Sequence, residues 1–217
     1  MAASQPSSDV EICNLALDYL NEAPITNIDT PNNPTAEICA RWYHAVRRGT
    51  LRLHPWNFAT KRDVLAKADV TVPFGYENAF TLPSDFVRLV AIGDDQFTDL
   101  TQYRYQVEDG YIYTSDIVSV ATSLKIRYVY NVDDVNKFDA LFVEVFVLRL
   151  AIKLARKFSA SSETKQELLE ELKTLMPASF SVDGQERPPT RIQLSKFISR
   201  RKGRRSQGYA GPYEILD

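Results

Sequence analysis

The sequence LRLHPWNFA at residues 51–59 separates two kinds of pattern along the chain. Before it, apolar residues recur at the three- and four-residue spacing of a helix, and Pro55 cannot continue that helix. After it, from Asn57 to Val132, short runs rich in valine, isoleucine, tyrosine and phenylalanine alternate with turn residues, as in antiparallel strands. The fold is therefore expected to change from helical to β at this point.

Two helices are expected before this segment. Ser8 or Asp9 can cap the first, and Asn21 can end it because asparagine tolerates the left-handed conformation. Asn33 is a cap for the second, with Pro34 at its first position. The apolar faces are predicted to hold Val10, Cys13, Leu17 and Leu20 in the first helix, and Cys39, Trp42, Val46 and Leu53 in the second.

The β region has two well-defined strands, Val87–Ile92 and Ser123–Tyr130. The segment Tyr105–Tyr113 has Asp109-Gly110 at its centre, and this dipeptide favours the tight turn of a hairpin. We expect a hairpin there.

Helical spacing returns after the β region. Residues Phe138 to Phe158 are predicted to form the most buried helix, with Arg149, Lys153 and Arg156 on a narrow exposed face. After a break and cap at 159–162, a last helix is expected from Glu163 to Met176 and to end at Pro177. Its inward residues are Leu168, Leu172 and Leu175.

These elements predict an α+β protein, a bundle of about four helices with an inserted small antiparallel β domain and an extended C-terminal arm. The expected divisions are an N-terminal helical pair (1–56), the β domain (57–132), helices completing the bundle (133–177) and the basic arm (178–217).

Charge is distributed unevenly. The net charge of −2 divides into −8 for residues 1–186 and +6 for residues 187–217. The stretch from Arg187 to Arg205 has eight basic residues and no acidic one, so it is expected to bind an acidic partner, either protein or nucleic acid. The candidate partner-binding residues are Arg187, Arg191, Ile192, Leu194, Phe197, Ile198, Arg200, Arg201, Arg204, Arg205, Tyr209, Tyr213, Ile215 and Leu216.

Composition is that of a globular protein, with 44% hydrophobic and 25% charged residues. The longest apolar stretch, Leu141–Ile152, contains Glu144 and Arg149 and is too short to span a bilayer, so no membrane partner is expected. The N-terminus has neither a basic start nor an apolar run, which predicts cytoplasmic synthesis. Cys13 and Cys39 are expected to be reduced core residues.

Residues with typical catalytic or metal-binding spacing are scarce. His44 and His54 are ten positions apart on one predicted helix and point in different directions, so they are interpreted as surface or cap residues. The pairs Asp94-Asp95 and Asp133-Asp134 are at strand ends, where aspartate commonly forms turns. We therefore expect no catalytic, metal-binding or cofactor-binding residues and no enzymatic activity.

Two uses of the basic arm stay open. The run Arg200-Arg-Lys-Gly-Arg-Arg205 can neutralise several phosphates and give salt-dependent binding to nucleic acid. It has no interleaved aromatic residues for base stacking, however, and apolar residues flank it on both sides. That pattern favours an extended peptide that docks into protein grooves or adds to a sheet edge.

Residues 12–59 resemble a known family. The segments ICNLALDYL (12–20), APITNID (23–29), CARWYH (39–44), VRR (46–48) and LRLHPWNFA (51–59) are similar to the opening of the tail tubular protein A family. The later LPSDFVRL (82–89), the Asp-Gly hairpin and the long apolar helix extend the similarity to about residues 10–176. Asn21 stands where relatives commonly have glycine, and the arm matches no family motif.

The resemblance implies a structural protein of the virion tail, a head-to-tail adaptor of short-tailed bacteriophages. It implies a ring of about twelve copies between the portal protein and the tail nozzle or tail tube, with DNA passing through the lumen without specific binding. Assembly would take place in the cytoplasm of the bacterial host. An acidic body suits such a lumen because like charges do not bind.

Three other functions are alternatives to the adaptor. A connector or completion protein of a long-tailed phage would share the ring. A nucleic-acid-binding protein would act through the basic arm. A cell-wall hydrolase of the tail would need an acid–base pair that the sequence does not display.

Aromatic and basic residues near the pattern change have two interpretations. Trp42, Trp56 and Phe58 can form a core joint between helices and β domain, or an interface. The candidate subunit interface consists of Arg41, Arg48, Arg52 and Trp56.

Overall fold

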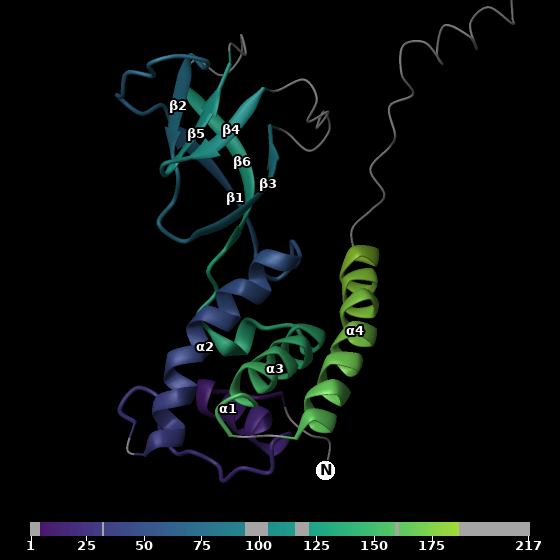
Figure 1. Ribbon diagram of the computed structural model, residues 1–217. Helices are drawn as coiled ribbons and strands as arrows, with labels where there is room; N and C mark the ends of the chain where they lie inside the picture. The colour runs from purple at the N-terminus through teal and green to yellow at the C-terminus, as the bar shows by residue number, and fades with distance from the viewer. Residues whose placement is uncertain (1–4, 32, 94–103, 116–121, 159–160, 187–217) are drawn as a thin grey trace, which may run out of the picture. The chain divides into compact units, whose positions relative to one another are not determined.

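Over the residues that the structure describes, four helices and two small antiparallel sheets make this an α+β protein, as the sequence predicted (Figure 1). The computed structural model describes residues 5–31, 33–93, 104–115, 122–158 and 161–186. The elements are α1 (Asp9–Asp18), α2 (Pro34–Leu53), β1 (Thr60–Ala66), β2 (Asn78–Thr81), β3 (Phe86–Ile92), β4 (Tyr105–Glu108), β5 (Tyr111–Thr114), β6 (Ser123–Tyr130), a 3-10 turn (Val135–Lys137), α3 (Ala140–Leu154) and α4 (Ser162–Gln185).

Short polar side chains begin the helices. The Ser8 Oγ accepts a hydrogen bond from Glu11 N (3.2 Å), and the Asn33 Oδ1 accepts one from Ala36 N (2.8 Å). Each contact satisfies a backbone donor that the first helical turn leaves without a partner. Asn21, with φ of 54°, follows α1 in the left-handed region. The predicted caps and stop are confirmed.

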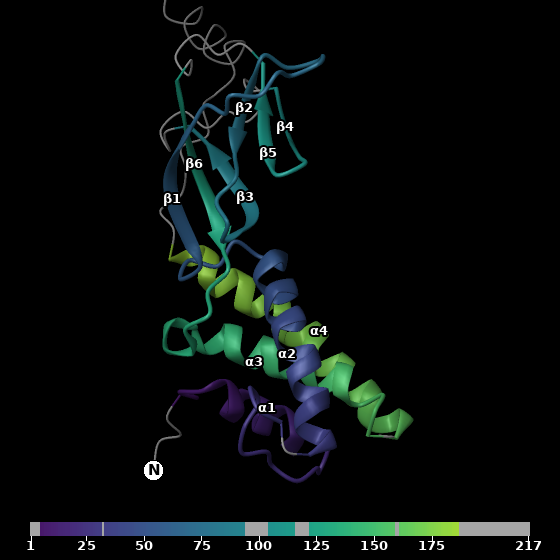
Figure 2. The same ribbon diagram turned by 90° about the vertical axis from the view of Figure 1, so that its left-hand side faces the viewer.

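Helix α3 is the centre of the bundle and packs against α1, α2 and α4 (Figure 1, Figure 2). It begins two residues later than predicted, because Asp139 caps its start by accepting hydrogen bonds from Leu141 N (2.9 Å) and Phe142 N, and it ends at Leu154 rather than at Phe158. The predicted exposed face is wrong at Arg149. That side chain is half-buried beside Gly49 of α2, and burial lowers the pKa of its guanidinium.

The buried stripe of α2 is also displaced from the prediction. Leu53, predicted to face inward, is 43% exposed, whereas Cys39 and Val46 are buried as expected. Tyr43, Arg47, Thr50 and Leu51 complete the buried face. Helix spacing alone cannot tell which of Leu51 and Leu53 is buried, since both are apolar and near the helix end.

The β domain holds a second, separate apolar core. Its sheets have strand orders β1-β6-β3 and β2-β5-β4. The predicted hairpin is confirmed, with Asp109 (φ 46°) and Gly110 (φ 76°) in the two positive-φ positions of the β4–β5 turn. The core residues are Leu65, Phe80, Ile92, Ile112, Leu124, Ile126 and Tyr128.

Helix α4 corrects the sequence prediction most clearly. It continues through Pro177 to Gln185, so neither the helix nor the third division ends at residue 177. A proline inside a helix removes one backbone hydrogen bond and disfavours the helix. Here Ser179 and Asp183 are buried on the far side of Pro177, and their contacts outweigh that penalty.

Both cysteines are free and fully buried, as predicted. A hydrogen bond to the Cys39 thiol, together with burial, raises the pKa of the Cys13 thiol. In the part of the chain that the structure describes, no helix is long and apolar enough to cross a membrane.

Candidate functional site: the joint between α2, β1 and α4

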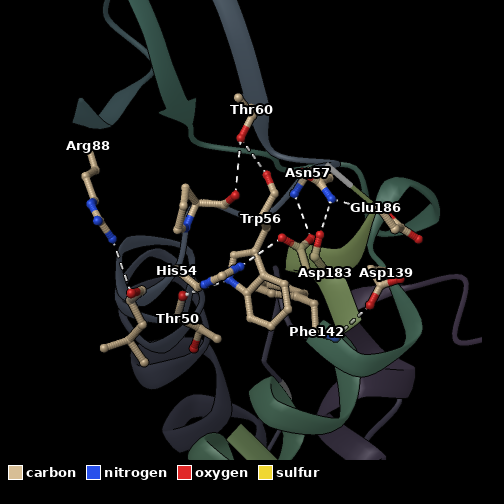
Figure 3. A network of polar contacts seen from close by, with 12 residues as sticks. Thr50, His54, Trp56, Asn57, Thr60, Arg88, Asp139, Phe142, Asp183 and Glu186 are labelled. Carbon is tan, nitrogen blue, oxygen red and sulfur yellow. Dashed lines mark hydrogen bonds and ion pairs between the residues drawn. The ribbon is translucent and has the colours of Figure 1, made fainter. Parts of the chain in front are cut away.

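The link between α2 and β1 contacts the end of α4, and Figure 3 shows this region. We call it the joint, and define it as residues 54–60 together with Phe142 of α3 and Phe180 and Asp183 of α4. Within the link, the Trp56 carbonyl accepts hydrogen bonds from Ala59 N (3.1 Å) and Thr60 Oγ1 (2.7 Å). The chain therefore makes a compact turn between helix and strand.

Trp56 is the centre of the joint and is fully buried. Its ring centroid lies 5.1 Å from His54, 5.3 Å from Phe142 and 5.5 Å from Phe180. The indole Nε1 donates to the Thr50 carbonyl (3.2 Å), which satisfies the polar atom of the ring. Trp56 is thus a core residue that connects three elements.

This burial corrects one prediction. A fully buried side chain is not accessible to a second subunit, so Trp56 does not belong to the candidate subunit interface. Of the other two aromatic residues that were predicted to form a joint or an interface, Phe58 lies in the joint and Trp42 does not. Phe58 packs on Phe142 at 5.0 Å, whereas the half-buried Trp42 lies under the Lys153 ammonium at 5.8 Å, away from the joint.

Asp183 fastens the end of α4 to the link. One carboxylate oxygen lies 2.8 Å from His54 Nε2, and the other accepts a hydrogen bond from Asn57 N (2.8 Å). The Asp183 carbonyl accepts a third from Asn57 Nδ2 (2.6 Å). A carboxylate that is only 7% exposed needs such partners, because an unpaired buried charge is strongly unfavourable.

His54 is held by its ring face as well as by its nitrogen. Its ring stacks on Phe180 with centroids 4.5 Å apart and an interplanar angle of 6°. His54 is also the C-cap residue of α2, as interpreted from the sequence. The histidine therefore connects the last residues of α2 to the last two turns of α4.

Asp183 is a joint residue outside the predicted helices, because Pro177 is the end of the last helix that the sequence predicts. The signal was present in the spacing of Leu168, Leu172, Leu175, Ser179 and Asp183, which follows the inward face without a break. Each of these five residues is buried or half-buried. Continued periodicity across a proline indicates a helix that tertiary contacts maintain.

Arginine side chains join α2 to β3. Arg48 Nη2 donates to the Phe86 carbonyl (3.1 Å), and Arg52 Nη1 donates to the Val87 carbonyl (2.5 Å). In the opposite direction, Arg88 Nη1 donates to the carbonyls of Arg52 and Leu53, both at 3.2 Å. Of the predicted interface arginines, Arg48 and Arg52 thus make contacts within the chain, and Arg41 is exposed on α2.

Arg47 is a further arginine of α2 that the predicted set omitted. It is buried, forms an ion pair with Asp133 and lies over the Tyr43 ring at 5.8 Å. Position 47 follows Tyr43 by four residues, so it shares the buried face of the helix. Asp133, predicted to be a solvated turn residue, is therefore paired as well as exposed, and Asp134 caps the 3-10 turn.

A second polar cluster lies in the β domain. Tyr128 Oη donates to Asp85 Oδ1 (2.9 Å), and Lys61 Nζ lies 3.1 Å from Asp85 Oδ2. Burial, together with the hydrogen bond to Asp85, raises the pKa of Tyr128 to about 12. Because the folded pKa exceeds the ordinary value of about 10, the folded state favours the protonated phenol.

Tyr128→Phe is expected to change how stability depends on alkaline pH. The contribution of the phenol is complete below about pH 10 and is lost as pH rises towards 12. The difference in unfolding free energy between parent and variant should therefore fall by about 1.4 kcal/mol per pH unit in this window. Urea unfolding from pH 8 to 12 measures it, and parallel curves would contradict the assignment.

A hollow of about 290 Å³ opens on the sheet of β1, β3 and β6. Its cationic side chains already have interactions within the chain. The lining residues are Arg62, Asp63, Val64, Gly93, Lys125, Ile126 and Arg127.

His44 is exposed and contacts the edge of Tyr43 with centroids 5.3 Å apart. No cluster of histidine, cysteine, aspartate or glutamate suitable for a metal ion occurs within the described ranges. Asp94, Asp95 and all the predicted partner-binding residues of the arm, from Arg187 to Leu216, lie outside those ranges.

Comparison with models of protein families finds no match to this chain, and comparison with curated proteins finds none either.

Proposed function

We propose that this chain is a structural subunit of a ring-shaped head-to-tail adaptor in a bacteriophage tail. The observation that carries the proposal is the coincidence of the joint with the residues that most resemble the tail tubular protein A family. The sequence HPWNFA (54–59) forms the link, and Trp56 packs between three elements. A motif that determines how the helices meet the β domain is expected to be retained wherever this architecture is.

The charge distribution supports the same proposal. Residues 1–186 carry −8 and residues 187–217 carry +6. An acidic body allows DNA to pass through a ring without adhering to it, because both surfaces are negative. A basic arm can bind an acidic surface on a neighbouring subunit or on the portal protein, and it increases the effective concentration of that contact. The proposed location is the virion tail, after assembly in the host cytoplasm.

Electron microscopy of the full chain mixed with the purified portal protein of the same virus tests the proposal. A ring that lies coaxially on the portal is the expected result. The arginines at positions 48 and 52 already bond within the chain, so Arg41→Glu on the exposed face of α2 should reduce ring formation more than either of their replacements by lysine. Absence of any complex with the portal would contradict the adaptor.

The alternative functions give different outcomes in the same preparation. A monomer whose DNA binding is strongly salt-dependent, and is abolished by deleting residues 187–205, would indicate a nucleic-acid-binding protein. A ring that binds the portal but not a tail nozzle would indicate a connector of a long-tailed phage. Degradation of bacterial cell wall by the isolated chain would indicate a hydrolase.

A further inference from the structure

Three tyrosines gather on the outer face of the sheet β2-β5-β4. Strand register places Tyr113 opposite Ala79 and Gln106, and Tyr111 opposite Thr81 and Glu108. Directly paired residues in antiparallel strands project to the same side. The intervening residues Phe80 and Ile112 therefore project to the other side, where they are fully buried in the core of the β domain. We call the outer side the tyrosine face, formed by Tyr76, Thr81, Gln106, Glu108, Tyr111 and Tyr113.

Contacts within the tyrosine face hold its side chains in place. The Tyr113 ring centroid lies 6.2 Å from Tyr76 and 5.9 Å from Tyr111. Tyr76 Oη donates to Gln106 Oε1 (3.3 Å), and Gln106 Nε2 donates to Glu108 (2.6 Å). All three tyrosines stay partly exposed. Tyrosines held in this way are effective contact residues, because they lose little conformational entropy on binding.

The surroundings of the face are mainly acidic. Glu108 and Asp109 are at the β4–β5 turn, and Glu77 precedes β2. Burial, followed by the charges of Asp109 and Glu108, raises the pKa of Tyr113. Among the described residues, Arg104 is an exposed cation at the end of the sheet away from the turn, and Lys67 pairs with Phe80 and therefore projects to the other side of the sheet. The turn end of the face therefore favours a cationic partner.

An exposed apolar side chain lies close to the face along the chain. Phe74, two residues before Tyr76, is 86% exposed, which is unusual for a phenylalanine. A partner that fits both features carries positive charge and apolar residues in one short segment. The sequence KFISRRK at 196–202 has four basic residues and two apolar ones among seven, and no acidic residue.

We propose that the tyrosine face binds residues 196–202 of a second copy of this chain. Arginine guanidinium groups stack on tyrosine rings and pair with carboxylates in bidentate geometry, and Phe197 and Ile198 supply apolar contact for Phe74 and the rings. The contact is heterologous, since arm and face are different surfaces, and such a contact generates a ring where the rotation between copies closes. The inference deepens the proposed adaptor and rests on its self-assembly.

Cysteine crosslinking between full-length chains tests the contact. Thr81→Cys in one preparation and Ser199→Cys in another introduce one new thiol each, and Cys13 and Cys39 do not compete with it because they are fully buried. After mixing and treatment with a bismaleimide, the expected product is a covalent dimer of twice 24.7 kDa. Thr174→Cys, an exposed threonine of α4, replaces Thr81→Cys as the matched control and should give at least tenfold less dimer.

A charge reversal provides the second readout. Glu108→Lys at the tyrosine face should reduce the dimer yield at least tenfold, whereas Glu170→Lys on the exposed side of α4 should leave it unchanged. Circular dichroism checks that both variants are folded. Equal yields from Thr81→Cys and Thr174→Cys, or no effect of Glu108→Lys, would overturn the inference.

The outcomes separate the two proposals. Rings on the portal without the crosslink from Thr81→Cys to Ser199→Cys would overturn the arm contact and leave the adaptor standing. The crosslink without any portal complex would overturn the adaptor and leave the arm contact standing. A double variant that crosslinks only within one chain would exclude the second copy as the occupant.

Discussion

Trp56→Ala is expected to lower the free energy of unfolding by about 3–5 kcal/mol, the range for removing a large aromatic side chain from a core. The ring is fully buried and contacts His54, Phe142 and Phe180, which come from three different parts of the chain. Removing it also leaves the Thr50 carbonyl without the indole donor. The end of α2, α3 and α4 therefore lose their common packing residue, and urea unfolding followed by circular dichroism measures the loss.

Phe74→Ala is the matched control for this variant. It also removes an aromatic side chain, but from a position that is 86% exposed. Surface substitutions of this kind usually change stability by less than about 0.5 kcal/mol. If the two variants were equally stable, Trp56 would not be the packing centre of the joint.

Asp183→Ala is expected to destabilise the protein by about 3 kcal/mol, because breaking a buried polar network leaves the remaining partners unsatisfied. The backbone N–H of Asn57 and the ring of His54 both lose their acceptor. The two helical turns after Pro177 lose their polar attachment to the link, so Phe180 should become a site of chymotrypsin cleavage. Unfolding in urea and limited proteolysis report the two effects separately.

Two further variants show whether the effect arises from the network. Asp183→Asn keeps an acceptor for Asn57 N and should retain more stability than the alanine variant. Glu170→Ala removes a carboxylate from the exposed side of the same helix and should change stability by less than about 0.5 kcal/mol. Protection of Phe180 from cleavage in Asp183→Ala would show that apolar contacts alone hold the end of α4.

Local chemistry explains what could be predicted from the sequence. Ser8 and Asn33 cap helices because their side-chain oxygens reach backbone donors two or three residues ahead. Asp109 and Gly110 tolerate positive φ, which the tight β4–β5 turn requires. Strand β6 occupies Ser123–Tyr130, the range predicted from its β-branched and aromatic residues. Each of these features depends on residues close together along the chain.

Partners that are far apart along the chain explain what could not be predicted. The extension of α4 beyond Pro177 depends on contacts between Asp183 and residues more than 120 positions earlier. Likewise, Arg149 of α3 lies beside Gly49 of α2 and is half-buried there, and the spacing of residues within α3 does not indicate which neighbour covers it. The sequence identified one half of the joint, residues 54–59, but spacing within the chain carries no information on which distant carboxylate completes it.

The pairing of β1 with β6 has a consequence for how the chain folds. The two strands enter and leave the β domain as neighbours, with Thr60 opposite Val129 and a hydrogen bond from Tyr130 N to the Ala59 carbonyl (3.0 Å). Once this sheet has formed, it holds the two ends of the long connection between α2 and α3 next to each other. The two helices can then meet without a further loss of loop entropy, a loss that grows with the logarithm of loop length. Early formation of the inserted domain should thus accelerate assembly of the helical core around it.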